Sequence, residues 1–173
     1  MRMKAGKVAV LMGSDTDIEV ARKAAEMLAR FSVPCEVHVM SAHRSPEKVW
    51  EFATSARENG FGVIIAIAGG AAHLAGVISS ATTLPVIGVP VATDVAGGLD
   101  SLLSTVQMPG GVPVLAVGTG SGGAVNAAVA AARIFALGDR ALAEKLEDYR
   151  VSLAKGVEEK DARIQSEFGK AEK

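Results

Sequence analysis

The amino-acid sequence predicts an α/β protein, a three-layer doubly wound parallel sheet with a C-terminal helical extension. Short apolar runs alternate along the chain with segments of helical character. The runs are continuously apolar, which is typical of parallel strands covered by helices on both faces. Between residues 61 and 138 the charged residues are Asp94, Asp100 and Arg133, as expected for a large buried core. Because crossover connections are right-handed, such a chain winds helices onto both faces of one sheet.

The first unit pairs a strand at Lys7–Met12 with a helix over residues 17–31. The strand is a partly β-branched apolar run that ends at Gly13. One face of the helix carries Val20, Ala24, Met27, Leu28 and Phe31. Thr16, with Glu19 three residues later, matches the capping box that begins many helices. The pattern predicts a strand and a helix joined by a short polar loop.

The second unit has a strand at Cys35–Met40 and a helix that begins at Pro46. Ser45 is the candidate N-cap, since proline favours the first helical position and serine the position before it. Gly60 predicts the end of this helix. His38 lies inside the strand without polar company, so we interpret it as structural.

The remaining elements continue the alternation, with apolar strands separated by helical segments. In order they are a strand at 63–68, a helix at 73–81, a strand at 85–91, a helix at 99–107, a strand at 114–117 and a helix at 123–136. We expect residues 1–138 to form one α/β domain, because no linker divides them.

The tail, residues 139–173, differs in composition because it is rich in charge. It predicts one or two solvated helices that pack on the domain or on a neighbouring subunit. Gly156 is a candidate break between them. The packing residues are expected to be Leu142, Leu146, Tyr149 and Leu153.

Composition limits the class of partner. The chain has 173 residues, 49% of them hydrophobic, and a formal net charge of -1, which predicts neither a nucleic-acid nor an anionic-membrane partner. Glycines and prolines interrupt the apolar middle too often for a membrane span. The single cysteine, Cys35, is expected to be a small buried hydrophobe in a reducing, cytoplasmic compartment, and the N-terminus shows no secretion signal. Because the middle of the chain is too apolar for a comfortable monomer, we expect other copies of the chain to cover part of its surface in a closed homo-oligomer.

Three loops that follow strands are the candidate site. In an open parallel sheet, ligands bind beyond the carboxyl ends of the strands. The loops at residues 13–17, 41–45 and 69–73 carry glycines, hydroxyls and two of the three histidines, and they are expected to lie at one edge. Backbone N–H groups at a helix N-terminus bind phosphate, and the fork of Arg44 suits phosphate or carboxylate. Asp17 could accept hydrogen bonds from sugar hydroxyls, and His43 could move a proton near neutral pH.

Each of these residues also has a purely structural interpretation. Ser14, Thr16 and Asp17 are common helix caps. His43 could satisfy a loop, and Arg44 could form a surface ion pair. The case for a phosphorylated small molecule depends on their concurrence at one edge of the sheet.

The glycine-rich segment at residues 118–123 resembles a dinucleotide-binding fingerprint. That fingerprint also requires an acidic residue at the end of the following strand. Here Asp139 follows a helix, and the segment lies in the last α/β unit. Close helix packing or a subunit contact explains the glycines better than a nicotinamide cofactor does.

Six blocks resemble, in order and spacing, the class I N5-carboxyaminoimidazole ribonucleotide mutase family, also called the catalytic subunit of phosphoribosylaminoimidazole carboxylase. The resemblance covers about residues 7–137. The blocks are MGSDTD (12–17), SAHRSP (41–46), AGGAAHLAG (68–76), LPVIGVPV (84–91), LDSLLSTVQMPGGVPV (99–114) and GAVNAAVAAARI (123–134).

The resemblance implies a flavodoxin-like domain, a homo-octamer, and a reaction without metal or organic cofactor. It implies that N5-carboxyaminoimidazole ribonucleotide is converted to 4-carboxy-5-aminoimidazole ribonucleotide in purine (IMP) biosynthesis, with His43 as the catalytic acid/base. The positions that bind the ribonucleotide would be Ser14, Asp17 and Arg44. The same pocket would be lined by Thr16, Ser41, Gly69, Gly70, Ala71 and His73.

Two alternatives stay open. The first is a class II relative, which carboxylates aminoimidazole ribonucleotide directly with free carbon dioxide. The block AGGAAHLAG at residues 68–76 favours the mutase over this alternative. A flavin or nucleotide carrier on the same fold would usually stack its ligand on aromatic side chains. Aromatic residues make up 4% of this chain, and Trp50 and Tyr149 both lie in predicted helices away from the loops.

Overall fold

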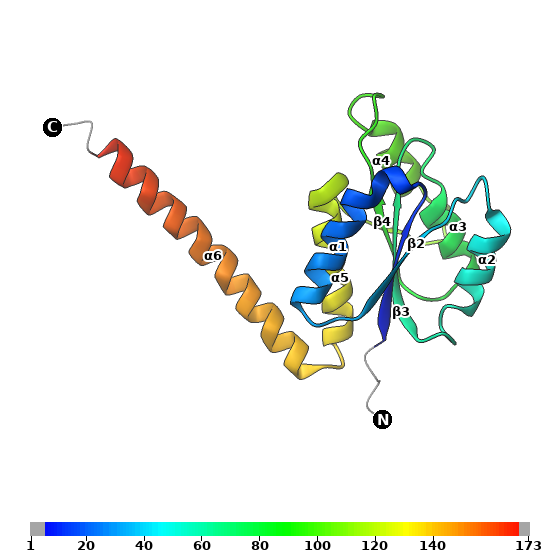
Figure 1. Cartoon of the computed structure of the whole chain (residues 1–173), viewed down its shortest axis with the longest axis horizontal. Helices are drawn as coiled ribbons and strands as arrows, with labels where there is room; N and C mark the ends of the chain where they lie inside the picture. Colours follow the sequence, from blue (N-terminus) through cyan, green and yellow to red (C-terminus); the bar gives the residue numbers. More distant parts are fainter. Residues whose placement is uncertain (1–5, 170–173) are drawn as a thin grey trace.

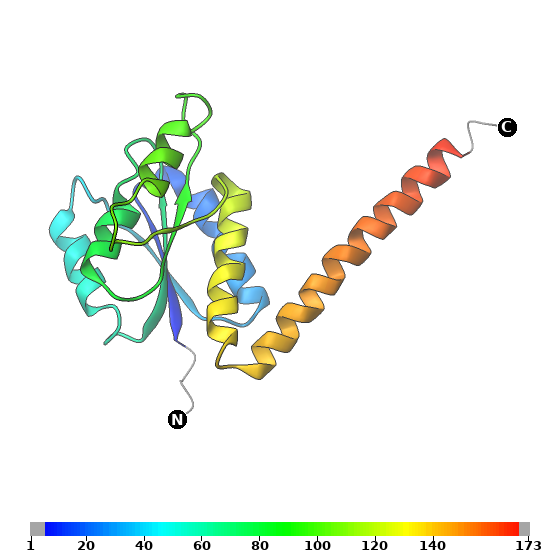
Figure 2. The same cartoon turned by 180° about the vertical axis from the view of Figure 1, so that it is seen from behind.

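The computed structural model describes residues 6–169 and confirms the predicted fold class. Five parallel strands form one sheet in the order β2-β1-β3-β4-β5, the flavodoxin-like order. Helices cover both faces, and a long C-terminal helix leaves the domain (Figures 1 and 2). The strands are β1 (Lys7–Met12), β2 (Cys35–Val39), β3 (Phe61–Ala68), β4 (Val86–Pro90) and β5 (Leu115–Ala116). The helices are the 3-10 turn η1 (Asp15–Asp17), α1 (Ile18–Arg30), α2 (Pro46–Ser55), α3 (Leu74–Ala81), α4 (Leu99–Val106), α5 (Gly120–Ala136) and α6 (Arg140–Phe168).

The apolar strands divide their side chains between two cores, one on each face of the sheet. In β1, Val8 and Val10 pack with α1 and α5, whereas Ala9 and Leu11 pack with α2 and α3. This alternation follows from the two-residue period of a strand. Figure 1 shows α1 and α5 on one side of the sheet and α2 and α3 on the other. Burial on both faces explains why β1 and β3 are apolar at successive positions.

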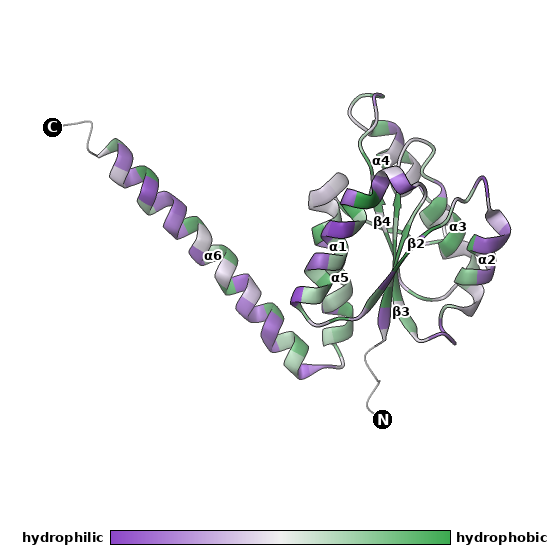
Figure 3. Ribbon diagram, viewed as in Figure 1, coloured by the Kyte–Doolittle hydropathy of each residue, from purple (hydrophilic) through white to green (hydrophobic). Residues whose placement is uncertain are grey.

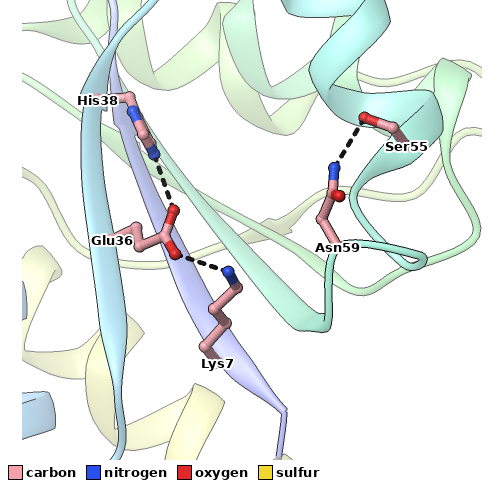
Figure 4. Close-up of polar contacts among 5 residues, drawn as sticks. All are labelled: Lys7, Glu36, His38, Ser55 and Asn59. Atoms are coloured by element: carbon pink, nitrogen blue, oxygen red, sulfur yellow. Dashed lines mark hydrogen bonds and ion pairs between the residues drawn. The ribbon is translucent and has the colours of Figure 1, made fainter.

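The strands at the sheet edges are less covered than the sequence predicts. Val37 and Val39 of β2 and Leu115 of β5 are exposed. The expectation that His38 lacks polar company is wrong, because its Nε2 lies 3.4 Å from Glu36, which also accepts a hydrogen bond from Lys7 at 2.6 Å (Figure 4). An exposed network of this kind contributes little stability.

The beginnings and ends of several helices differ from the prediction. Thr16 does not cap α1; it lies inside η1, and its backbone N–H donates to Ser14 Oγ at 3.4 Å. Helix α2 ends at Ser55, and Asn59 folds back to donate a hydrogen bond to the Ser55 hydroxyl at 3.2 Å (Figure 4). Such short-range polar contacts compete with regular helix geometry at helix ends.

Helix α5 begins at Gly120 and not at Gly123, so the glycine-rich segment forms its first turn. A Cβ on Gly123 would overlap the carbonyl group of Gly118, whereas a Cβ on Gly122 would meet nothing within 4 Å. Close approach of the backbone therefore accounts for Gly123, as the packing interpretation predicts.

The tail is one helix, α6, and Gly156 does not break it. Leu142 is buried and Leu146 and Tyr149 pack on the core, but Leu153 is 54% exposed and does not pack there as predicted. Figure 3 shows α6 projecting from the domain with hydrophilic and hydrophobic residues mixed along it. The division of the chain at residue 138 stays a prediction. None of the helices among residues 6–169 is long and apolar enough to cross a membrane.

Candidate functional site

A cavity of about 570 Å³ lies at the carboxyl edge of the sheet, where the loops after the first four strands meet. Its position is the one predicted from the sequence, because ligands bind beyond the carboxyl ends of the strands in an open parallel sheet. Its lining consists of Gly13, Ser14, Thr16, Asp17, Ser41, Ala42, His43, Arg44, Ala68, Gly69, Ala71, His73, Leu74, Val91, Ala92 and Thr93.

The loop after β1 brings a hydroxyl and a carboxylate to the cavity. Ser14 caps η1, and Asp17 stands directly before α1. Burial raises the pKa of the Asp17 carboxyl, a nearby Thr16 hydroxyl opposes this shift, and the negative charge of Asp15 adds to it. A partly desolvated carboxylate is a strong hydrogen-bond acceptor, as recognition of hydroxyl groups requires.

The loop after β2 holds Arg44 in place. The Arg44 guanidinium donates from Nη2 to the carbonyl of Gly13 at 3.2 Å and from Nε to Ser41 Oγ at 3.4 Å. Ser45 precedes Pro46 at the start of α2, but its hydroxyl bonds to the backbone of Ser41 and does not cap the helix. Arg44 is therefore held by its own loop and by the loop after β1, and its side chain lines the cavity.

The two histidines of the loops meet across the cavity. His43 Nε2 lies 2.8 Å from His73 Nδ1, and the two rings are nearly perpendicular, at 84°. Two ring nitrogens at this distance need one proton between them, because one must donate and the other accept. The pair can therefore share a proton on the lining of the cavity and pass it from one ring to the other.

The structure brings together all the predicted site residues except one. Gly70 lies in the third loop but does not line the cavity. The prediction missed a fourth wall, residues 91–93, which follows β4. The same strand-end rule could have found it, but the segment carries no histidine or basic residue to draw notice. The contact between His43 and His73 carries no sequence signal, because the two residues lie thirty positions apart.

The described residues contain no group of three or more His, Cys, Asp or Glu side chains placed to hold a metal ion. The chemistry that the cavity offers is that of backbone N–H groups, hydroxyls, one guanidinium, one carboxylate and a histidine pair. These groups suit a phosphorylated ribosyl compound and a proton transfer.

Comparison with known proteins places this geometry in a family. A family model described as AIR carboxylase matches residues 7–156. An N5-carboxyaminoimidazole ribonucleotide mutase of Pyrococcus horikoshii is 48% identical over 165 residues, covering 95% of this chain and 92% of that protein. The corresponding Bacillus subtilis mutase is 52% identical over 143 residues, covering 83% and 88%.

A solved structure agrees with the sequence relatives. The crystal structure of Treponema denticola PurE superposes with a TM-score of 0.83 at 30% identity and covers 91% of this chain and 98% of that chain. These matches confirm the family that the six sequence blocks predict. The family model, the sequence relatives and the solved structure each match most of the chain. The chain therefore belongs to the AIR carboxylase family.

Proposed function

We propose that the chain is an isomerase that converts N5-carboxyaminoimidazole ribonucleotide to 4-carboxy-5-aminoimidazole ribonucleotide in de novo purine biosynthesis. The relatives named N5-carboxyaminoimidazole ribonucleotide mutase match 95% and 83% of the chain. The observation that carries the proposal is the His43–His73 pair, set 2.8 Å apart in a cavity whose other walls suit a ribose phosphate.

The substrate is held by groups from the first two loops. Backbone N–H groups and the hydroxyl of Ser14 at the start of η1, together with Arg44, bind the phosphate. Asp17 accepts hydrogen bonds from the ribose hydroxyls. The imidazole ring then extends toward the third loop, where Gly69 and Ala71 leave room for it.

His43 moves the proton that the isomerisation requires. The carbamate C–N bond breaks, carbon dioxide leaves, and the nitrogen takes a proton from His43. Carbon C4 of the ring then attacks the trapped carbon dioxide, and neutral His43 removes the proton from C4, so that the proton count is restored. Holding carbon dioxide against the ring gives it a high effective concentration. His73 assists His43 in these transfers, because the two rings share a proton.

The test is an assay with freshly made carbamate substrate in the absence of bicarbonate. Because proton transfer by a positioned side chain is worth roughly 10²–10⁴-fold, we expect His43→Asn to lose at least that order of turnover while still binding ribonucleotide. His38→Asn is the matched control, since His38 lies on β2 and does not line the cavity. Normal turnover by His43→Asn would remove His43 from the mechanism.

A parallel assay with aminoimidazole ribonucleotide, with and without bicarbonate as the source of carbon dioxide, separates the mutase from a carboxylase of the class II type. A carboxylase would convert aminoimidazole ribonucleotide when carbon dioxide is supplied and would leave the carbamate substrate unused in the first assay. The proposal is wrong if the protein behaves in that way.

We further propose that the protein works as a homo-octamer in the cytoplasm and uses neither metal nor organic cofactor. Apolar side chains exposed on single-chain surfaces support association, because monomers seldom leave many of them in water. They include Leu99, Leu103 and Val106 on α4 and Val151, Leu153 and Val157 on α6.

A further inference from the structure

Helix α4 (Leu99–Val106) carries the polar side chains that are almost fully buried among the described residues. These are Ser101, at 0% exposure, and Thr105, at 3%. Buried hydroxyls need a partner, and the two find it in different places. Thr105 Oγ1 donates to the Ser101 carbonyl inside the same helix at 2.7 Å. The Ser101 hydroxyl instead has a partner outside its helix, because it accepts a hydrogen bond from the backbone N–H of Gly70 at 2.8 Å.

Gly70 lies in the loop after β3, which carries His73 to the site. The loop offers only small side chains for packing, since it reads Gly69-Gly70-Ala71-Ala72 before the histidine, and of its two alanines Ala72 is the buried one. Backbone hydrogen bonds therefore contribute much to holding its path. Gly70 has φ of 63°, a left-handed conformation, and its carbonyl accepts from Ala72 N at 2.8 Å.

Helix α4 contacts the backbone of Gly70 through two hydroxyls. Ser101 accepts a hydrogen bond from the Gly70 N–H at 2.8 Å, whereas Ser104 Oγ donates to the Asp100 carbonyl at 2.7 Å and lies 3.4 Å from the Gly70 carbonyl. Asp100, which precedes Ser101 in α4, holds the fourth wall of the cavity, because it accepts from Thr93 Oγ1 at 2.6 Å. This hydrogen bond lowers the pKa of the Asp100 carboxyl, because it favours the charged, accepting form. One helix thus joins two walls of the site.

We propose that Ser101 is a positioning residue for the reaction, which holds Gly70 so that His73 stays against His43. This role rests on the proposed function. Without the Ser101 hydroxyl, the Gly70 N–H loses its hydrogen bond to α4, and the loop is free to shift. His73 stands three residues further on at the start of α3, so the shift changes the 2.8 Å contact with His43.

The test compares Ser101→Ala with Thr105→Val. Thr105→Val is the matched control because it removes a buried hydroxyl of the same helix, keeps the methyl group that packs on Gly88, and leaves the Gly70 contact intact. Displacements of about 1 Å in an active site cost up to about 100-fold in rate, so we expect kcat of Ser101→Ala to fall by about 10- to 100-fold. KM should change by less than about threefold, since the residues that grip the ribose phosphate belong to other loops. Thr105→Val should keep normal kcat.

A double-mutant cycle separates positioning from general loss of structure. If Ser101 acts through His73, then on a His73→Ala background Ser101→Ala should lower kcat by no more than about twofold. An equal loss on both backgrounds, an equal loss in Thr105→Val, a change confined to KM, or unchanged turnover would each overturn the proposal. Should Ser101→Ala fail to fold, Ser101→Cys takes its place, because it fills the same space with a much weaker acceptor.

The unsubstituted protein keeps the two claims distinct. If it fails to convert the carbamate substrate, the proposed function falls and the role of Ser101 with it. If it turns over normally while the Ser101 variants do so too, only the role of Ser101 falls.

Discussion

Asp17 carries its charge in a place that disfavours it. Burial raises the pKa of its carboxyl from the usual 3.8, which means that folding favours the protonated form. The free energy of unfolding therefore decreases as the pH rises from 3.8 through the higher pKa of the folded state, and it stays lower above that. The proposed function explains this cost, because there Asp17 is the acceptor for the ribose hydroxyls.

Replacing Asp17 with asparagine tests that cost. The asparagine side chain does not titrate, so Asp17→Asn should raise Tm relative to the unsubstituted protein at about pH 7, and the difference should shrink toward about pH 3. KM for the ribonucleotide should rise, because the neutral amide is a weaker acceptor. Thermal unfolding of both proteins across this range measures the effect. A Tm difference that does not change with pH would contradict it.

Two neighbouring glycines in the first turn of α5 differ in their surroundings: one is required by close packing and the other is not. Gly123 is buried against the Gly118 carbonyl, whereas Gly122 faces open space one residue earlier. The resemblance of this segment to a phosphate-binding fingerprint therefore has a packing cause. The first turn of α5 must come this close because it lies directly against the loop that leads from β5 into it.

The two glycines predict opposite outcomes for the same substitution. Gly123→Ala should lower the free energy of unfolding by at least about 2 kcal/mol, because backbone must move to admit the methyl group. Gly122→Ala should raise it by up to about 1 kcal/mol, since alanine favours a helix and restricts the unfolded chain. Urea unfolding of both variants measures the difference. Equal effects would show that close approach is not what Gly123 provides.

The apolar stripe of α6 continues beyond the domain on which its first turns pack. Leu142 is buried, but Leu153, Val157, Ile164 and Phe168 are exposed at helical spacing along the part of the helix that projects away (Figure 1). A stripe that runs from a buried into an exposed stretch is typical of a surface that another subunit covers.

Charge placed on this stripe should weaken association. We expect the double substitution Leu153→Glu and Val157→Glu to reduce the sedimentation coefficient toward that of a monomer, because buried charge without a partner is costly. Lys155→Glu is the control, since it introduces the same side chain on the same helix at an exposed charged position. If both proteins sediment like the unsubstituted chain, the outer half of α6 takes no part in assembly.

The sequence by itself determined the order of the strands and helices, the loops that bear the site, and the family. These depend on local periodicity and on the rule that parallel strands end at one edge, so residues such as His43 and Arg44 could be found without coordinates. Helix ends were less predictable, because Thr16 and Ser45 made local hydrogen bonds other than the expected caps.

Only the tertiary structure decided which distant residues meet. The contact of His43 with His73 and that of Ser101 with Gly70 each join positions about thirty residues apart. Such contacts depend on how far each helix shifts and rotates as it packs on the sheet, which is a property of the whole core and leaves no periodic trace in the chain. For the same reason the sequence marked α4 only as a helix, and the structure showed that it supports two walls of the site.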